Sequence, residues 1–121
     1  MKSTNTKEEI LELLFDFPTR SFHIREISRL LKIAPHSISK ASKQLEKENL
    51  ITLEKKLTHN IKADLDNENF TNLKRSKNLE RIHSSNLFNY LKEQFPLSTI
   101  VLFGSFSKGS DIEKSDIDIA V

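Results

Sequence analysis

The sequence has 121 residues and contains no cysteine, only two glycines and only three prolines. Without cysteine, disulfides and thiolate zinc sites are excluded. No apolar run approaches the roughly 18 residues that a membrane-spanning helix needs, and the first nine residues lack the apolar core of an export signal. We therefore expect a cytoplasmic protein with no membrane partner. A hydrophobic content of 36% with 30% charged residues is typical of a globular chain of one ordinary or two small domains.

Positive charge is concentrated in the first half of the chain. Residues 20–62 carry ten Lys/Arg against four Asp/Glu, a net charge of +6. The whole chain carries +2, so the remaining residues carry −4. A basic first half suits a polyanionic partner such as nucleic acid, and a solvated basic surface is the alternative.

The spacing of apolar residues predicts three helices in this half, at residues 7–17, 25–31 and 35–48. Pro35 stands at the first position of the third helix, where its missing N–H costs nothing. Short strands are predicted at residues 20–24, 50–56 and 61–65, with a turn at 58–60. The residues expected to face the core are Ile10, Leu13, Leu14, Phe17, Ile27, Leu30, Leu31, Ile38, Ala41 and Leu45.

With this order of helices and strands, residues 24–65 resemble a winged helix-turn-helix domain of the prokaryotic regulator type. The resemblance implies that the helix at 35–48 enters the major groove of DNA and that the hairpin, or wing, touches backbone or minor groove. Lysine and serine mostly contact phosphates, whereas Gln44 is suited to reading a base edge. Winged helices also serve as protein-docking or homodimerisation modules, and this alternative stays open. The expected nucleic-acid-binding residues are His36, Ser37, Ser39, Lys40, Lys43, Gln44, Lys47, Lys55 and Lys56, with His59 near the tip of the wing.

The segment that follows predicts a helical joint between two domains. Asn67, Glu68 and Asn69 are expected to cap a new helix. Residues 74–78 interrupt its apolar face with polar residues, and residues 84–86 are expected to break the segment so that a second helix starts at Asn86. We expect an α+β protein with domains at residues 1–68 and 69–121, the second containing the first part of a mixed sheet with helices.

Both glycines lie in the last nineteen residues, where we predict a buried strand at 97–103, a turn at Gly104-Ser105 and a second strand at 116–121. A glycine turn directly after a strand lets the backbone approach a phosphate closely. Its N–H groups, the Ser105 hydroxyl and Lys108 would then form an anion site.

Two carboxylates follow at i and i+2 of the second strand. Asp116 and Asp118 would share one face, and such hard oxygen ligands suit Mg²⁺. Ile117, Ile119 and Val121 would face the core. Asp111 and Glu113 are expected to be solvated loop residues.

A strand, Gly-Ser, ten residues and then Asp-x-Asp on a second strand resembles the nucleotidyltransferase motif of the polymerase-beta superfamily, in particular the minimal nucleotidyltransferases of prokaryotes. The resemblance implies that Gly104 and Ser105 contact the phosphates of ATP or another nucleoside triphosphate. It implies that Asp116 and Asp118 are catalytic and hold two Mg²⁺ ions. Lys108-Gly109 stands where the family usually has Arg-Gly, which keeps the charge and the glycine but loses the bidentate fork. The resemblance implies that Lys108 and Gly109 also contact the nucleotide.

The implied reaction is transfer of a nucleoside monophosphate to a hydroxyl acceptor on a small molecule, an RNA or a partner protein such as a toxin. The family takes a third carboxylate from a later strand, and no residue here matches it. We therefore expect a truncated domain, or one that a partner chain completes, with little transferase activity of its own. The competing hypothesis is a winged-helix transcriptional regulator whose second domain is a non-catalytic dimerisation or sensing platform.

Overall fold

The structure, a computed structural model, describes residues 5–55 and 59–121. The chain divides into two compact units, residues 1–70 and 71–121, and the expected boundary after residue 68 falls two residues earlier. The first unit contains α1 (Thr6–Asp16), β1 (Phe22–His23), α2 (Ile24–Leu31), α3 (Pro35–Lys47), β2 (Ile51–Lys55) and β3 (His59–Ala63). The helix α4 (Glu68–His83) begins at the end of this unit and is followed by α5 (Asn86–Gln94), β4 (Val101–Phe103), α6 (Gly104–Lys108) and β5 (Asp118–Ala120).

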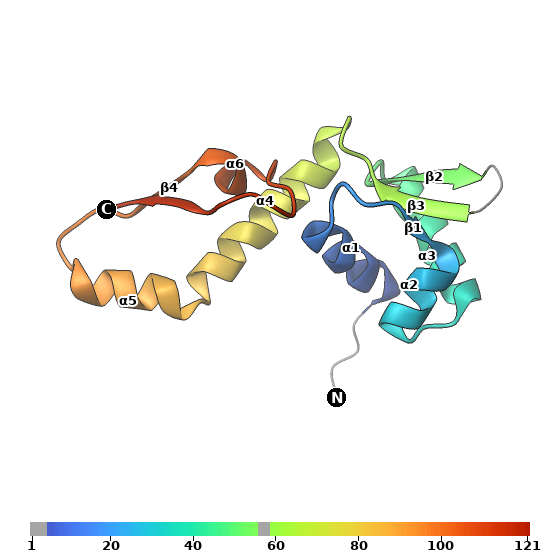
Figure 1. Cartoon of the computed structure of the whole chain (residues 1–121), viewed down its shortest axis with the longest axis horizontal. Helices are drawn as coiled ribbons and strands as arrows, with labels where there is room; N and C mark the ends of the chain where they lie inside the picture. Colours follow the sequence, from blue (N-terminus) through green and yellow to red (C-terminus); the bar gives the residue numbers. More distant parts are fainter. Residues whose placement is uncertain (1–4, 56–58) are drawn as a thin grey trace. The chain divides into compact units, whose positions relative to one another are not determined.

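In the first unit, α1, α2 and α3 are grouped around a small sheet (Figure 1). The sheet is antiparallel with strand order β1-β3-β2, and Ile61 of the central strand pairs with both Phe22 and Leu53. This order of elements is that of a winged helix-turn-helix, so the predicted fold of this part is confirmed. The buried apolar core consists of Ile10, Leu14, Phe15, Phe22, Ile27, Ile38, Ala41, Leu45, Leu50, Ile51, Ile61, Ala63 and Phe70.

Local hydrogen bonds explain where the helices of the helix-turn-helix begin and end. The His23 imidazole Nδ1 accepts from the Arg25 backbone N–H at 3.1 Å and caps α2. After α2, Lys32 adopts left-handed backbone angles, and the Ser28 hydroxyl donates to the Ile33 carbonyl at 2.5 Å. Pro35 then starts α3, as the sequence predicts. These contacts fix the turn that sets α2 against α3.

Three predictions about the first unit are wrong in detail. Phe17 is 40% exposed because it lies beyond the end of α1 with φ of −132°, where helical spacing no longer holds, and Phe15 is buried instead. Leu30 is 54% exposed because the short helix α2 buries only a narrow stripe centred on Ile27. His59 and Asn60 do not form the hairpin turn, since they pair with β2 as the first residues of β3.

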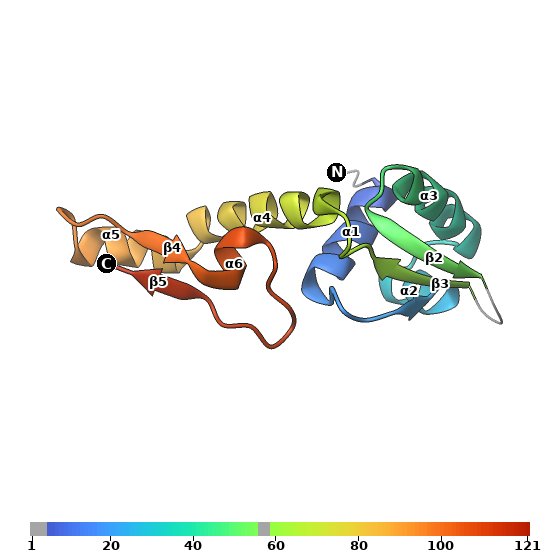
Figure 2. The same ribbon diagram turned by 90° about the horizontal axis from the view of Figure 1, so that it is seen from above.

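In the second unit, β4 and β5 form a two-stranded antiparallel sheet (Figure 2). Leu102 pairs with Ile119, and alternation along the strands puts both on one face. That face meets α4 and α5 around an apolar pocket of about 220 Å³. The pocket is lined by Leu79, Ile82, His83, Leu87, Phe88, Leu91, Ile100, Leu102 and Ile119.

The predicted strands of this unit are shorter and more exposed than expected. β4 contains three residues rather than seven, and Val101 and Phe103 are exposed because their face of the sheet has no covering layer among the described residues. β5 likewise begins only at Asp118, and Ile117 and Val121 are exposed rather than buried. The expected helix break is confirmed, with α5 starting at Asn86, and the polar residues 74–78 lie within the continuous helix α4.

None of the helices formed by residues 5–55 and 59–121 is both long enough and apolar enough to cross a membrane.

Candidate functional site

The turn between β4 and α6 brings together the two halves of the predicted motif. β4 ends at Phe103, and α6 begins at Gly104 with φ of +80°. Asp118 pairs with Phe103 across the sheet. A Cβ atom added to Gly104 would collide with the Asp118 carboxylate oxygen Oδ2. Glycine is therefore required at position 104 for two reasons: its backbone φ is positive, and the Asp118 carboxylate occupies the space that a Cβ atom would need.

The first turn of α6 presents donors beside this carboxylate. The first N–H groups of a helix have no acceptor within the helix and are free for an anion. The Ser107 hydroxyl donates to the Gly104 carbonyl at 2.7 Å and stabilises the tight start of the helix. Ser105 is half-buried at its second position. The turn thus combines N–H donors, a hydroxyl and the Asp118 carboxylate within one short stretch of structure.

The remaining predicted residues of this site lie outside the turn itself. Asp116 is exposed and lies in the loop two residues before β5, so it does not share a strand face with Asp118 as predicted. Lys108 is the exposed last residue of α6. Within residues 5–55 and 59–121 no three His, Asp or Glu side chains are close enough together to hold a metal ion.

Gly109 has a packing role in this structure. It ends α6 with φ of +76° and is buried. A Cβ atom here would collide with the Thr71 carbonyl oxygen and lie 2.8 Å from the Arg75 backbone nitrogen, both in the main chain of α4. The predicted contact of Gly109 with a nucleotide therefore remains a proposal, whereas its close approach to α4 is a feature of the fold.

Sequence reasoning missed a buried polar cluster that holds the end of α6. The Lys74 ammonium forms an ion pair with Asp111 Oδ1 at 2.7 Å and donates to the Asp111 carbonyl at 2.5 Å. The Asn78 amide donates to the Phe106 carbonyl at 3.0 Å and to Asp111 Oδ1 at 2.8 Å. Asp111 is thus not the solvated loop residue that the sequence predicts, because α4 covers it. The available signal was the i, i+4 spacing of Lys74 and Asn78 in line with the buried Phe70.

The second predicted site lies in the first unit, on the face of α3 opposite the core. Ile38, Ala41 and Leu45 are buried, as predicted. The expected contact residues on this helix are all accessible, with Ser37 and Ser39 half-buried and the others exposed. The exposed ones are His36, Lys40, Lys43, Gln44 and Lys47. The side chain of Lys55 and the whole of Lys56 lie outside the described residues.

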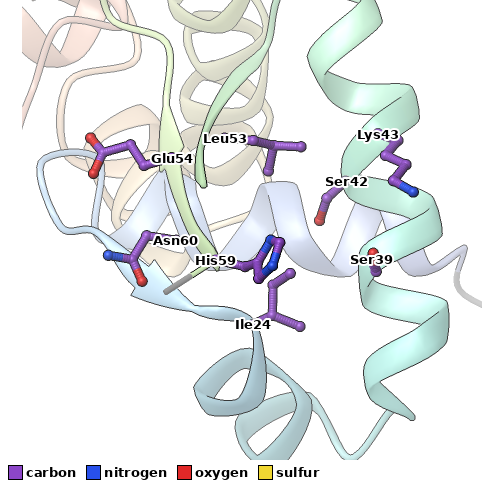
Figure 3. A pocket seen from close by; sticks show the side chains of 8 residues that line it. All are labelled: Ile24, Ser39, Ser42, Lys43, Leu53, Glu54, His59 and Asn60. Atoms are coloured by element: carbon purple, nitrogen blue, oxygen red, sulfur yellow. The ribbon is translucent and has the colours of Figure 1, made fainter. Parts of the chain in front are cut away.

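A pocket of about 130 Å³ separates α3 from the wing (Figure 3). His59 pairs with Lys55 and, by alternation, lies on the same face of β3 as the buried Ile61. Its imidazole accordingly points toward α3, where Ser39 and Ser42 lie, whereas Glu54 and Asn60 project from the opposite face of the wing (Figure 3). The pocket is lined by Ile24, Ser39, Ser42, Lys43, Leu53, Glu54, His59 and Asn60.

An open groove of about 540 Å³ along α2 extends the basic surface beyond the residues that the sequence predicted. Arg25 and Arg29 lie one helical turn apart and both are exposed. Glu26 in the same groove is paired with Arg20, which neutralises it. The groove also includes His23, Ser28 and Pro35, the first residue of α3. Two exposed guanidinium groups in one groove are suited to phosphate contacts.

Comparison with known proteins gives a result for each part of the chain. Residues 85–121 match the family model described as polymerase beta, nucleotidyltransferase. The match covers less than half of the chain and includes Gly104, Ser105, Asp116 and Asp118. A search of curated protein sequences finds no match.

Among solved structures, the chain is similar to the crystal structure of the adhesin competence repressor AdcR from Streptococcus pyogenes. The two are 22% identical over 78% of this chain and 69% of that chain, with a TM-score of 0.52. At this identity the similarity concerns the fold alone. The chain is thus an α+β protein with the fold of a winged-helix regulator and a segment similar to the nucleotidyltransferases of the polymerase-beta type.

Proposed function

We propose that the second unit binds the phosphates of a nucleoside triphosphate together with Mg²⁺, and that the first unit binds DNA. The position of the Asp118 carboxylate over Gly104 is the observation that carries the first half of this proposal. This carboxylate would repel a phosphate that bound to the backbone N–H groups at the start of α6 without a cation. Phosphate binding would become favourable with a cation that neutralises both negative charges.

The residues present fit a magnesium ion. Mg²⁺ is usually bound through one or two carboxylates plus substrate phosphates and water; Asp118 supplies one carboxylate, and in this proposal Asp116, two residues earlier in the chain, supplies the second. Bound there, Mg²⁺ would neutralise charge on the phosphates. In this proposal Gly104 and Ser105 bind phosphate oxygens through backbone N–H groups. Lys108 contributes a cation at the other end of α6.

The chemistry that this arrangement supports best is transfer of a nucleoside monophosphate to a hydroxyl acceptor. In this proposal the turn orients the triphosphate beside the Asp118 carboxylate. Binding without transfer, in a unit that serves as a sensing or dimerisation platform of a regulator, is the second candidate. The turn holds one carboxylate, that of Asp118, and the described residues contain no group of three side chains that could hold a metal ion, which favours this second candidate.

Calorimetric titration with ATP, with and without Mg²⁺, tests the nucleotide site. We expect Mg²⁺-dependent binding that Asp118→Asn weakens at least tenfold, because the variant keeps the shape of Asp118 but loses the charge that holds the cation. Glu93→Gln is the matched control, since it removes one charge from α5, which covers the opposite face of the sheet. Equal affinity of Asp118→Asn and wild type would refute the assignment, as would the absence of Mg²⁺-dependent binding to the wild-type chain.

The DNA-binding half of the proposal depends on the charge of α3. Lys40, Lys43 and Lys47 are exposed on one helix that carries no acid before Glu46. Charge reversal by Lys40→Glu should weaken binding to duplex DNA, with the largest effect at low salt. Lys92→Glu makes the same change in net charge on α5, in the other unit. If both variants weaken binding equally, α3 is not the contact surface.

A further inference from the structure

We infer that Lys74 and Asn78 of α4 are positioning residues for the Gly104–Ser105 turn, which they hold through Asp111 and the Phe106 carbonyl. This inference rests on the proposed nucleotide binding for its functional meaning. Both side chains are only 1% exposed and lie one helical turn apart on the same face of α4. Neither one belongs to the predicted motif.

Burial of the polar cluster formed by Lys74, Asn78 and Asp111 costs free energy, and this cost favours a role in positioning α6 over a role in stability. An ammonium group buried without a partner is strongly unfavourable, and a buried ion pair rarely stabilises more than apolar residues of the same size would. Lys74 nevertheless lies buried against Asp111, whose side chain is 14% exposed. In this inference the pair fixes geometry, because Lys74 and Asn78 both bind Asp111, and Asn78 also binds the Phe106 carbonyl.

The second unit has little else to hold α6 in place. Phe106 is the one buried apolar residue among the described residues of this unit, whereas the first unit has a continuous core. Asn78 reaches the main chain of that same residue through the Phe106 carbonyl. The polar cluster thus takes the place of an apolar core under α6.

The position of the phosphate donors follows from these contacts. α6 contains five residues, so the Phe106 carbonyl lies within the same short helix as the Ser105 N–H. Gly109 holds the other end of α6 against the main chain of α4. A shift of α6 along α4 would move the donors of Ser105 relative to the Asp118 carboxylate. Lys74 and Asn78 oppose that shift.

The test measures ATP affinity, melting temperature and the rate of amide hydrogen exchange in the turn. Lys74→Met and Asn78→Ala should lower Mg²⁺-dependent ATP affinity by about 10-fold to 100-fold, the usual effect of removing a residue that orients a ligating group. Hydrogen exchange of the Ser105 and Phe106 amides should become faster. Asn72→Ala, at an exposed position of α4, and Lys77→Met, at a half-buried position paired with Glu80, are matched controls and should leave both measurements unchanged.

A double variant separates positioning from stability. Lys74→Met leaves the Asp111 carboxylate uncompensated, whereas Lys74→Met with Asp111→Leu removes the whole pair and should recover the melting temperature. If Lys74 positions the turn, the double variant regains stability but not ATP affinity. Wild-type ATP affinity in a folded Lys74→Met or Asn78→Ala protein would overturn the inference.

The experiment distinguishes failure of the proposed nucleotide binding from failure of the positioning role of Lys74 and Asn78. If the wild-type chain binds no nucleotide, the proposed function is wrong. Amide exchange at Ser105 then still decides whether Lys74 and Asn78 hold the turn, and unchanged exchange in both variants would refute that as well.

Discussion

Replacement of Gly109 by alanine tests the close packing of α6 against α4. Alanine in the left-handed region costs about 1–2 kcal/mol, and Gly109 has φ of +76°. The added Cβ would also meet the main chain of α4 at Thr71 and Arg75, which cannot rotate away as a side chain can. Overpacking of this kind typically costs about 1–3 kcal/mol. Alanine recovers about 0.4–1 kcal/mol through the lower entropy of the unfolded chain.

The expected net loss is therefore about 1–5 kcal/mol in the stability of the second unit. The single tyrosine, Tyr90, lies in α5 of that unit, and the chain has no tryptophan. Tyrosine fluorescence during urea unfolding thus reports on this unit alone. Because a small unit has a slope near the lower end of the usual range of about 1–3 kcal/mol per molar urea, we expect the midpoint to fall by about 1 M or more.

A second variant separates the two costs. Asparagine tolerates left-handed backbone angles better than alanine but carries the same Cβ atom. If the approach to α4 dominates, Gly109→Asn and Gly109→Ala should destabilise the unit similarly. If backbone angles dominate, Gly109→Asn should be clearly milder. A Gly109→Ala protein that unfolds at the wild-type urea concentration would refute both the packing argument and the conformational one.

Two further predictions concern the first unit. Lys32 ends α2 with φ of 57°, so Lys32→Gly should stabilise the protein by about 0.5–1 kcal/mol in thermal unfolding, and a lower melting temperature would contradict this. If Arg25 and Arg29 bind DNA phosphates, the double alanine variant should lower the slope of log affinity against log salt by about 0.9 for each phosphate that is no longer neutralised. An unchanged slope would remove the α2 groove from the interface.

The first unit could be predicted well because its signals are local. Apolar residues at helical spacing, Pro35 at the start of α3 and two short alternating segments define each element within a few residues of sequence. The errors occur where the chain leaves regular structure. Phe17 lies beyond the last turn of α1, so a helical pattern no longer describes where its side chain lies, and it packs edge-on against Phe22 with ring centroids 6.2 Å apart.

The second unit was harder to predict because burial there depends on what covers each face of the sheet. The apolar run at 97–103 predicts a buried strand, but an apolar run carries no information about which layers are present. Among the described residues, the face with Leu102 and Ile119 meets α4 and α5, while Val101 and Phe103 face the other way and are exposed. Asp118 pairs with Phe103 on the neighbouring strand, so both side chains lie on the face of the sheet away from α4 and α5.

The two glycines show which contacts the motif predicts and which depend on residues outside it. Both stand out in a chain with no others, and the motif assigns both to the nucleotide. The structure gives them different neighbours, since Gly104 makes room for the Asp118 carboxylate and Gly109 for the main chain of α4. The spacing from Gly104 to Asp118 is part of the motif and can be read from the sequence. The main chain that Gly109 approaches belongs to α4, more than thirty residues earlier in the sequence. In the sequence alone, the polar residues of α4 only interrupt its apolar face, and their role becomes clear once Asp111 is seen to pack against Lys74 and Asn78. The geometry of the candidate site therefore depends on α4 as much as on the motif, and substitutions in α4 should affect it as strongly.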